Sequence, residues 1–591
     1  MKLNLNFYEK DVDIKNLNDE SKSIISNCDS FNYEQNCNSD ISNDTFNCIT
    51  ECNRNIIEWY DFSKTDSVLE INMTNGIITN FLCDKFSQVT SVCFKKEDFE
   101  LLKNKLEKLD NLEVIVGNMD KIVFDKKFDY ILFAGGIEEL IKFYSKDLKS
   151  FVLYMKELLN KDGKLLLCFD NSFSVKTLVG GKNFYENESS LSFETIKNTI
   201  KECDLNYKVY YPLPDYKICN VIYSDEFLPL TSSSKLMYNL NYIKNSIVIG
   251  NEHSYLKNFI EQGIFDKVTN SYFIEIGELE EKHSQPRFVS FNNLRKKEHR
   301  LTTKMYKEFV IKTPQGNGSD IHIKNITKYI KDFSSLGLNS LDSSDGNEII
   351  SKFCNLTTFN KIIINDILNG KIDETFKMLD LWRDKVLSKL TVNKNIDDIS
   401  SQNIFVRFNI NLDQEKLSNF KFTEFGFYDL VFENAFFDGK EFLFYDQEWK
   451  EKNVPIEFIL YRAINNIYLY CEKLEEILPK ENVLKHFNIE NYVEIFDKLE
   501  RSIQKYILDE LRLLVYKNST NHKINLEREI KDKKELLEVC TSQNTKYDRL
   551  YNEYLSIKEK CEYMEKELVS IRDSRSYKIM QSLNFKSKRG N

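Results

Sequence analysis

The sequence has little proline and glycine and no long apolar run. Of 591 residues only 7 are Pro and 18 are Gly, which excludes collagen-like repeats and long proline-rich or glycine-rich linkers. No stretch reaches the roughly 18 apolar residues of a membrane-spanning helix, and the polar residues 1–6 do not resemble a signal peptide. We therefore expect a cytoplasmic protein.

Paired cysteines and excess positive charge are missing as well. The 13 Cys are scattered, odd in number and without a C-x₂-C pair, so reduced thiols are predicted and not a zinc site. The net charge of −10 and the pI near 5.5 argue against a general nucleic-acid binder. The chain does have 41% hydrophobic and 13% aromatic residues, and its length predicts roughly three or four units.

Apolar strands alternate with helical segments near the N-terminus. The expected strands are Ser67–Ile71, Val89–Cys93, Leu112–Asp120, Phe128–Phe133 and, after a helix and a turn, the end of Leu158–Leu167. This order predicts a parallel sheet with helices on both faces, an α/β Rossmann-like fold. Ligands of such sheets lie at the carboxyl ends of the strands.

Three side chains in the C-terminal half have the spacing of a phosphotransferase site. Asp429 and Asn434 are five residues apart, and Asp446 follows twelve residues later, after a predicted hairpin that turns at Asp438-Gly439. Phosphoryl transfer needs a carboxylate base, oxygen ligands for Mg²⁺ and a Lys for the phosphates of ATP. We therefore predict Asp429 as the base, Asn434 and Asp446 as the Mg²⁺ ligands, and Lys312 as the phosphate ligand.

The match to this site is incomplete. No Gly-rich loop precedes Lys312, and Tyr428 stands where Arg or Gly is preferred. The acidic partner expected for Lys312 is missing, because only Asp320 and Asp332 lie at plausible distances along the chain. The alternative is a turn followed by an acidic loop without catalytic function.

Apolar residues near the C-terminus recur at alternating steps of three and four. They are Tyr547, Leu550, Tyr554, Ile557, Cys561, Met564, Leu568 and Ile571, with a weaker continuation upstream through Cys540 and Leu536. The pattern predicts a coiled-coil helix that joins copies of the chain into a homo-oligomer. A helix folded back on its own domain is the alternative. The basic end Lys586–Arg589 could contact anionic lipid at the inner face of a membrane.

Several motifs resemble class I S-adenosylmethionine-dependent methyltransferases from bacterial surface-polysaccharide gene clusters. The resemblance rests on Asn53–Tyr60, Val116–Asn118, Phe128-Asp129, Asp162-Gly163, Tyr210–Lys217 and Tyr223–Pro229. It continues through Phe288–Glu298, Tyr445–Trp449 and Pro455–Arg462. The resemblance implies a fold of three parts: a Rossmann-like methyltransferase domain, an α+β bilobal kinase-like domain and a coiled-coil helix.

The resemblance also implies a cofactor site. Glu70 would orient the methionine end of S-adenosylmethionine, Gly76 would end the glycine loop, Cys93 stands at the position that binds the ribose, and Asn118 would contact the adenine. Two glycines of this loop are replaced by Asn72 and Thr74, whose Cβ atoms disfavour positive φ and fill ligand space. A sheet that only supports the other domain is the alternative.

Methyltransferase, kinase-like domain and coiled coil in this order resemble O-antigen chain terminators. We therefore expect a transferase of surface-glycan biosynthesis that uses ATP and Mg²⁺ to phosphorylate a glycan end. The alternatives are an active methyltransferase on a sugar or sugar phosphate, and a non-catalytic scaffold for glycosyltransferases. The expected partners are a glycan or lipid-linked acceptor and a glycosyltransferase or polymerase, with no nucleic acid. The expected parts are an extension (1–50), a methyltransferase-like domain (51–230), a connector (231–285), a kinase-like domain (286–518), a coiled coil (520–575) and a basic tail (576–591).

Overall fold

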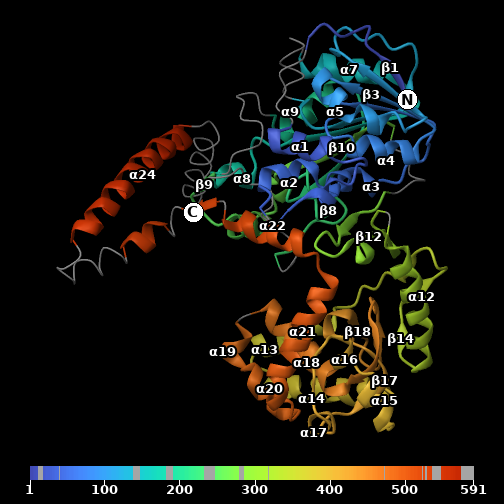
Figure 1. Ribbon diagram of the computed structural model, residues 1–591, viewed down its shortest axis with the longest axis vertical. Coiled ribbons are helices and arrows are strands. Elements are labelled where there is room, and N and C mark those ends of the chain that lie inside the picture. Colours follow the sequence, from blue (N-terminus) through green and yellow to red (C-terminus); the bar gives the residue numbers. More distant parts are fainter. Residues whose placement is uncertain are drawn as a thin grey trace. The chain divides into compact units, whose positions relative to one another are not determined.

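The computed structural model divides the chain into two compact units, which Figure 1 shows in colours that follow the sequence from blue to red. Unit 1 comprises Met1–Ser290 and Leu511–Asn591, and unit 2 comprises Phe291–Glu510. The structure describes residues 1–10, 17–38, 40–137, 147–180, 191–231, 246–278, 285–316, 318–471, 473–521, 523–525, 529–534 and 547–573. The predicted basic tail and the weak upstream heptads at Leu536 and Cys540 lie outside the described residues.

A mixed sheet forms the centre of unit 1. Its strands lie in the order β1-β4-β3-β2-β5-β6-β10-β7-β8-β11. Strands β1 to β6 pair in parallel, whereas β10, β7, β8 and β11 pair antiparallel with their neighbours. The bounds are β1 Lys2–Asn4, β2 Ser67–Ile71, β3 Gln88–Cys93, β4 Leu112–Val116, β5 Phe128–Ala134, β6 Leu159–Asp170, β7 Tyr207–Leu213, β8 Val221–Ser224, β10 Ser271–Ile276 and β11 Phe288–Phe291. The predicted parallel strands are confirmed, but the sheet as a whole is mixed because four antiparallel strands extend it beyond β6.

Short apolar runs make the central strands, because both faces of a parallel sheet are covered. All the side chains of β3 except that of Gln88 are buried, and helices α4 (Ile77–Lys85) and α5 (Lys96–Leu106) pack against it. Helices α7 (Leu148–Leu158) and α9 (Phe193–Glu202) contact each other. Asp147 and Ser192 begin these two helices with side chains that accept hydrogen bonds from the first turn.

Two segments outside the predicted methyltransferase-like range belong to unit 1. Residues 1–50, expected as a loose extension or short helices, form β1 and the helices α1 (Asp19–Ser26), η1 (Tyr33–Asn36) and α2 (Asn43–Ile49), followed by η2 (Glu51–Arg54) and α3 (Asn55–Glu58). In the expected connector, α10 (Glu252–Glu261) and α11 (Phe265–Val268) precede β10. Strand β10 lies inside the sheet, between β6 and β7.

Unit 2 combines small sheets with many helices. The antiparallel strands β12 (Leu301–Met305), β13 (Phe309–Pro314), β16 (Ile349–Lys352) and β15 (Asp342–Ser344) form one sheet, and helix α12 (Asp320–Ser335) packs beside it. The other strands are β14 (Asn339–Ser340), β17 (Phe422–Phe427), β18 (Ala435–Phe437), β19 (Phe442–Phe444) and β20 (Lys450–Pro455). The predicted hairpin is present, since β18 pairs antiparallel with β19 around Gly439 at φ 97°.

The remaining helices of unit 2 surround one large apolar core. They include α13 (Phe359–Leu368), α14 (Ile372–Lys385), α18 (Ile456–Tyr470), α20 (Lys480–His486) and α21 (Val493–Ile507). Trp382 and Phe359 stack within this core and are fully buried. Unit 2 is therefore a mixed α and β body whose core is formed by these helices together with strands β17 to β20.

After unit 2 the chain re-enters unit 1 with α22 (Glu510–Asn521), β21 (Lys523–Asn525) and α24 (Tyr547–Asp573). Strand β21 pairs in parallel with β9 (Ser246–Val248). The predicted heptad segment from Tyr547 is helical throughout α24. In the part of the chain that the structure describes, no helix combines the length and apolarity needed to cross a membrane.

Candidate functional site

The strand order of unit 1 predicts where a ligand crevice would lie. From β2 the chain moves outward through β3 to β4 and then returns to the other side of β2 with β5. Ligands of open α/β sheets bind at the carboxyl ends of the strands where the order reverses. The residues that follow β2 and β5, Asn72 and Gly135, lie at this point.

The loop after β2 keeps a glycine-like backbone although it lost two glycines. Asn72 has φ 71° and Gly76 has φ 77°, so the expected penalty of a Cβ at Asn72 does not prevent the left-handed conformation. Asn tolerates this conformation better than most residues because its short amide side chain can hydrogen-bond locally. Here the Asn72 Nδ2 donates to the Gly135 carbonyl oxygen at 3.1 Å.

Glu70, on strand β2, holds the start of the loop through two hydrogen bonds. Its buried carboxylate accepts hydrogen bonds from the Thr79 hydroxyl at 2.7 Å and from the Ser91 hydroxyl at 2.6 Å. Burial raises the pKa of Glu70 to about 7, against the opposing effect of these two hydroxyls. These two hydrogen bonds join Glu70 to helix α4 and strand β3, so the carboxylate connects the start of the loop to its neighbours.

Two further predicted cofactor positions follow the neighbouring strands. Cys93 ends β3 and is fully buried, and its Sγ lies 3.1 Å from the Lys95 carbonyl oxygen. No carboxylate therefore stands at that position for ribose hydroxyls. Asn118 follows β4, and its Oδ1 is buried without a hydrogen-bond partner, as is the Oδ1 of Asn72.

Aromatic side chains border the crevice. A Cβ built on Gly76 would lie 2.6 Å from the ring of Phe31, and a Cβ on Gly135 would collide with the hydroxyl of Tyr216. The Tyr33 hydroxyl donates to the Asn75 carbonyl oxygen at 2.7 Å. Both glycines are therefore required by close contacts as well as by positive φ.

An ion pair at the carboxyl end of β6 was not predicted as part of the site. Lys217 Nζ contacts Asp170 Oδ2 at 2.5 Å, and the side chain of Asp170 is only 9% exposed. Asp170 is the last residue of β6 and therefore lies at the ligand edge of the sheet. Two features of the sequence could have indicated this ion pair. Asp170 follows the apolar run at the end of β6, and Lys217 ends the Tyr210–Lys217 motif.

Unit 2 brings Lys312 and Asp446 together. Lys312 on β13 contacts Asp446 Oδ1 and lies 2.8 Å from Glu448 Oε1. Arg295 also contacts Glu448. The acidic partners of Lys312 are thus Asp446 and Glu448, and not Asp320 or Asp332, which the sequence places at plausible distances.

Asp429 and Asn434 lie beside this cluster. The Asn434 Nδ2 donates to the backbone oxygens of Asp429 at 3.2 Å and Asp446 at 3.3 Å. The carboxylate of Asp429 lies 3.3 Å from the Arg462 guanidinium. The structure therefore places all four predicted phosphotransfer residues close together. Arg462 and Glu448 also belong to this cluster, although the residue spacing did not indicate them.

Burial and charge act in opposition on these carboxylates. Burial raises the pKa of Asp446, against the lowering effect of Lys312. Burial also acts to raise the pKa of Glu448, but the charges of Arg295 and Lys312 outweigh it and hold that pKa well below the ordinary range. Among the described residues no group of three or more His, Cys, Asp or Glu side chains is arranged to hold a metal ion.

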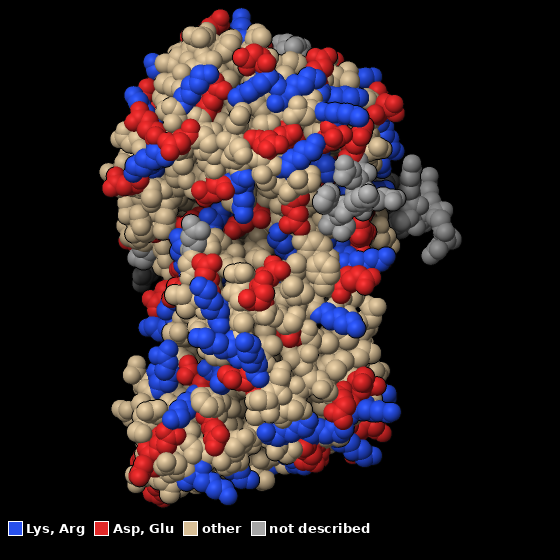
Figure 2. Space-filling model, turned by 90° about the vertical axis from the view of Figure 1, so that its right-hand side faces the viewer, with Lys and Arg blue, Asp and Glu red and all other residues tan. Residues whose placement is uncertain are grey.

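Lysine, arginine and carboxylate side chains are interleaved on the face of the molecule that Figure 2 shows. Such mixing differs from the continuous basic surface that binds a nucleic-acid backbone.

Residues 69–167 match a family model described as "Methyltransferase domain". A search of curated proteins found no match. Solved structures with similar folds include phosphoethanolamine N-methyltransferase 1 of Haemonchus contortus, at 12% identity over 45% of this chain and 50% of that chain, with a TM-score of 0.28. This chain thus spans half of that enzyme.

Two further similar structures are also methyltransferases. The plantazolicin methyltransferase BamL is 16% identical over 44% of this chain and 95% of that chain, with a TM-score of 0.24. The N-methyltransferase NodS of Bradyrhizobium japonicum is 10% identical over 36% of this chain and 86% of that chain, with a TM-score of 0.22. The family model carries the assignment: the N-terminal part of the chain contains a methyltransferase domain over residues 69–167.

Proposed function

We propose that unit 1 binds S-adenosylmethionine at the carboxyl ends of its parallel strands and transfers the methyl group to an acceptor. The observation that carries the proposal is the pair of buried amide oxygens, Asn72 Oδ1 and Asn118 Oδ1, that lack a hydrogen-bond partner. Buried polar atoms in native structures are nearly always paired. A ligand with N–H donors would satisfy both oxygens.

S-adenosylmethionine fits this requirement, because its ammonium group and the adenine amino group are donors. Asn72 and the loop up to Gly76 would hold the methionine end, and Asn118 would hold the adenine. When bound, the cofactor supplies a methyl group on a positively charged sulfur, which a nucleophile can attack. Cys93 offers no carboxylate to the ribose, so we expect weaker binding than an acid at that position would give.

The acceptor side of the proposal rests on Asp170. Its carboxylate lies at the ligand edge of the sheet, and Lys217 is the one described cation in an ion pair with it. We propose that Asp170 accepts a proton from the hydroxyl of a sugar or sugar phosphate, the acceptor class that the resemblance of the Tyr210–Lys217 run implies. Lys217 would hold the Asp170 carboxylate in place for this purpose.

Calorimetric titration of the full-length protein with S-adenosylmethionine tests the proposal. Asn118→Ala removes one unpaired acceptor without touching the loop, and we expect about tenfold weaker binding, since a hydrogen bond to a ligand contributes on the order of 1 kcal/mol. Val123→Ala, at a side chain that is 77% exposed, is the matched control. Equal affinity in Asn118→Ala and wild type would remove Asn118 from the site, and no binding to wild type would reject the function.

A second candidate, phosphotransfer by unit 2, is favoured by the contact of Lys312 with Asp446 beside Asn434. As placed, these residues do not fit Mg²⁺, because the ammonium of Lys312 occupies the Asp446 oxygen that the ion would need. We therefore propose nucleotide binding by Lys312 without assigning a metal-dependent step. Titration with ATP in EDTA and again with MgCl₂ tests this candidate, and no heat in either buffer would reject it.

A further inference from the structure

We propose that Arg512, on helix α22 at the far end of the chain, is a positioning residue for the cofactor loop of unit 1. This inference rests on the proposed S-adenosylmethionine site. Arg512 follows Asp429 and Asp446 in the sequence but belongs to the same unit as the N-terminal helices. Arg512 comes after unit 2 in the sequence, yet it helps to hold a site that is built from residues 67–170.

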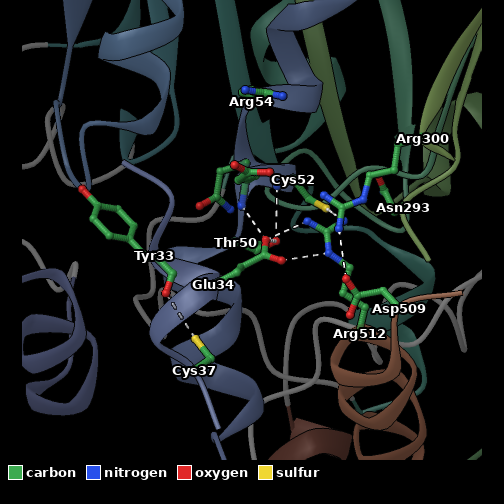
Figure 3. Close-up of polar contacts among 12 residues, drawn as sticks. Tyr33, Glu34, Cys37, Thr50, Cys52, Arg54, Asn293, Arg300, Asp509 and Arg512 are labelled. Carbon is green, nitrogen blue, oxygen red and sulfur yellow. Dashed lines mark hydrogen bonds and ion pairs between the residues drawn. The ribbon is translucent and has the colours of Figure 1, made fainter. Parts of the chain in front are cut away.

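Arg512 is anchored by two-point contact with Glu34 on η1. Its Nε donates to Glu34 Oε2 at 2.9 Å and one terminal nitrogen donates to Oε1 at 2.7 Å, as Figure 3 shows. The side chains are 3% and 11% exposed. A buried, bidentate pair of this kind fixes direction as well as distance, which a single charge contact does not.

Glu34 joins three segments through the same carboxylate. Its Oε1 also accepts from the Thr50 hydroxyl at 2.7 Å and from the Glu51 backbone N–H at 2.8 Å. The other terminal nitrogen of Arg512 lies 3.2 Å from the Sγ of Cys52. Helix α22 is thereby tied both to η1 and to η2, the two short helices on either side of α2.

Each of these short helices contacts the cofactor loop. From η1, the Tyr33 hydroxyl donates to the Asn75 carbonyl oxygen at 2.7 Å. From η2, the Asn53 side-chain oxygen accepts from the Asn75 Nδ2 at 2.9 Å. Residues adjacent in sequence to both partners of Arg512 thus hold the same loop residue, and Phe31 packs against the following Gly76.

The same hydrogen-bond network extends to Lys217 and Asp170, where we propose that the methyl acceptor binds. The Asn53 Nδ2 donates to the Lys217 carbonyl oxygen at 3.0 Å, and Lys217 holds Asp170. A shift of η2 would therefore move the loop and the Lys217 segment together. Removing Arg512 would leave the Glu34 carboxylate buried without its cation, a state that a structure relieves by moving the carboxylate toward water.

The test is S-adenosylmethionine affinity in the full-length protein. Arg512→Met keeps the length and apolar stem of the side chain, and we expect at least tenfold weaker binding. Arg512→Lys restores charge without the two-point contact and should recover part of the loss. Lys164→Met breaks another buried pair of unit 1, Lys164 with Glu275 at 2.5 Å, in the middle of β6 and six residues before Asp170. This control should lose stability but bind with wild-type affinity.

Tyr33→Phe covers the case in which Arg512→Met does not fold. It removes only the hydroxyl that contacts Asn75, and we expect several-fold weaker binding with an unchanged unfolding temperature. Wild-type affinity in folded Arg512→Met, or in Tyr33→Phe, would overturn the positioning role while leaving the methyltransferase proposal intact. If wild type itself does not bind S-adenosylmethionine, both are overturned.

Discussion

The two units treat their polar side chains in opposite ways. At the proposed cofactor positions of unit 1, Asn72 and Asn118 are neutral amides whose Oδ1 atoms are buried without partners. In unit 2 three of the four predicted residues are charged, and each of these contacts an opposite charge of the chain itself: Lys312 with Asp446, and Asp429 with Arg462. The two amides of unit 1 thus leave acceptors free for a ligand, whereas the charges of the three ionisable residues predicted in unit 2 are balanced within the chain.

A motif with the right spacing is therefore not always a site with free groups to bind a ligand. The spacing of Asp429, Asn434 and Asp446 matches phosphotransferases better than the loop around Asn72 matches methyltransferases. Nevertheless, a ligand in unit 2 must first displace an internal partner of Asp446, whereas a ligand in unit 1 gains bonds that the protein leaves unmade. Unit 1 is therefore the stronger candidate for activity.

The largest expected effect comes from breaking the compensation in unit 2. Lys312→Met leaves Asp446 without its cation and Glu448 with one cation fewer, and we expect unit 2 to lose about 3 kcal/mol or more of unfolding free energy. Lys452→Met, which removes a more exposed ion pair with Asp398 at side-chain exposures of 41% and 23%, should cost much less unfolding free energy than Lys312→Met. Urea unfolding followed by tryptophan fluorescence measures both, because Trp382 and Trp449 lie in unit 2. Equal losses would contradict the compensation.

A pH-dependent effect is expected beneath the crevice of unit 1. The pKa of Glu70 is about 7 in the folded protein against an ordinary 4.5, so the protonated form is favoured by folding. Its stabilising contribution is complete below about pH 4.5 and is lost as the pH rises through about 7.

Glu70→Gln should therefore be more stable than wild type by up to about 3 kcal/mol at pH 8, and the difference should vanish near pH 4.5. Chemical denaturation of both proteins at several pH values measures this. A difference that does not change with pH would show that Glu70 does not titrate as the structure indicates.

Replacing Asn72 by glycine tests whether its side chain contacts the cofactor. Asn72→Gly removes the side chain that bridges to Gly135 while keeping the left-handed backbone at φ 71°. We expect altered S-adenosylmethionine affinity within about tenfold: tighter if opening the crevice outweighs the loss of the Asn72 Oδ1 acceptor, weaker if it does not. Identical affinity in titrations of both proteins would place the ligand away from Asn72.

The smallest effect on either site is expected at the C-terminal helix. We propose that α24 joins copies of the chain through its heptad face; Met564 on that face is 6% exposed, whereas Tyr563 beside it is 63% exposed. Tyr554→Glu, at another heptad position, should lower the mass measured by light scattering without changing ligand affinity. An unchanged mass would favour a helix folded back on its own chain.

Much of the fold was predictable because the spacing of apolar residues along the sequence indicates which side chains are buried. The strands of the parallel sheet and the β18–β19 hairpin follow directly from apolar runs and a turn at Gly439. The placement of β10 between β6 and β7 was not predictable, because strand adjacency depends on contacts between distant segments. The same holds for the roles of Glu448 and Arg512, whose partners lie 136 and 478 residues away.

The most direct test of the account is a crystal structure of the full-length protein with S-adenosylhomocysteine. We predict the ligand at the carboxyl ends of β2 to β5, with donors on Asn118 Oδ1 and the Asn72 side chain turned away from Gly135. A crevice in which the Asn72 bond to Gly135 persists and no ligand is present at saturating concentration would contradict the proposal and leave unit 1 as a support for the rest of the chain.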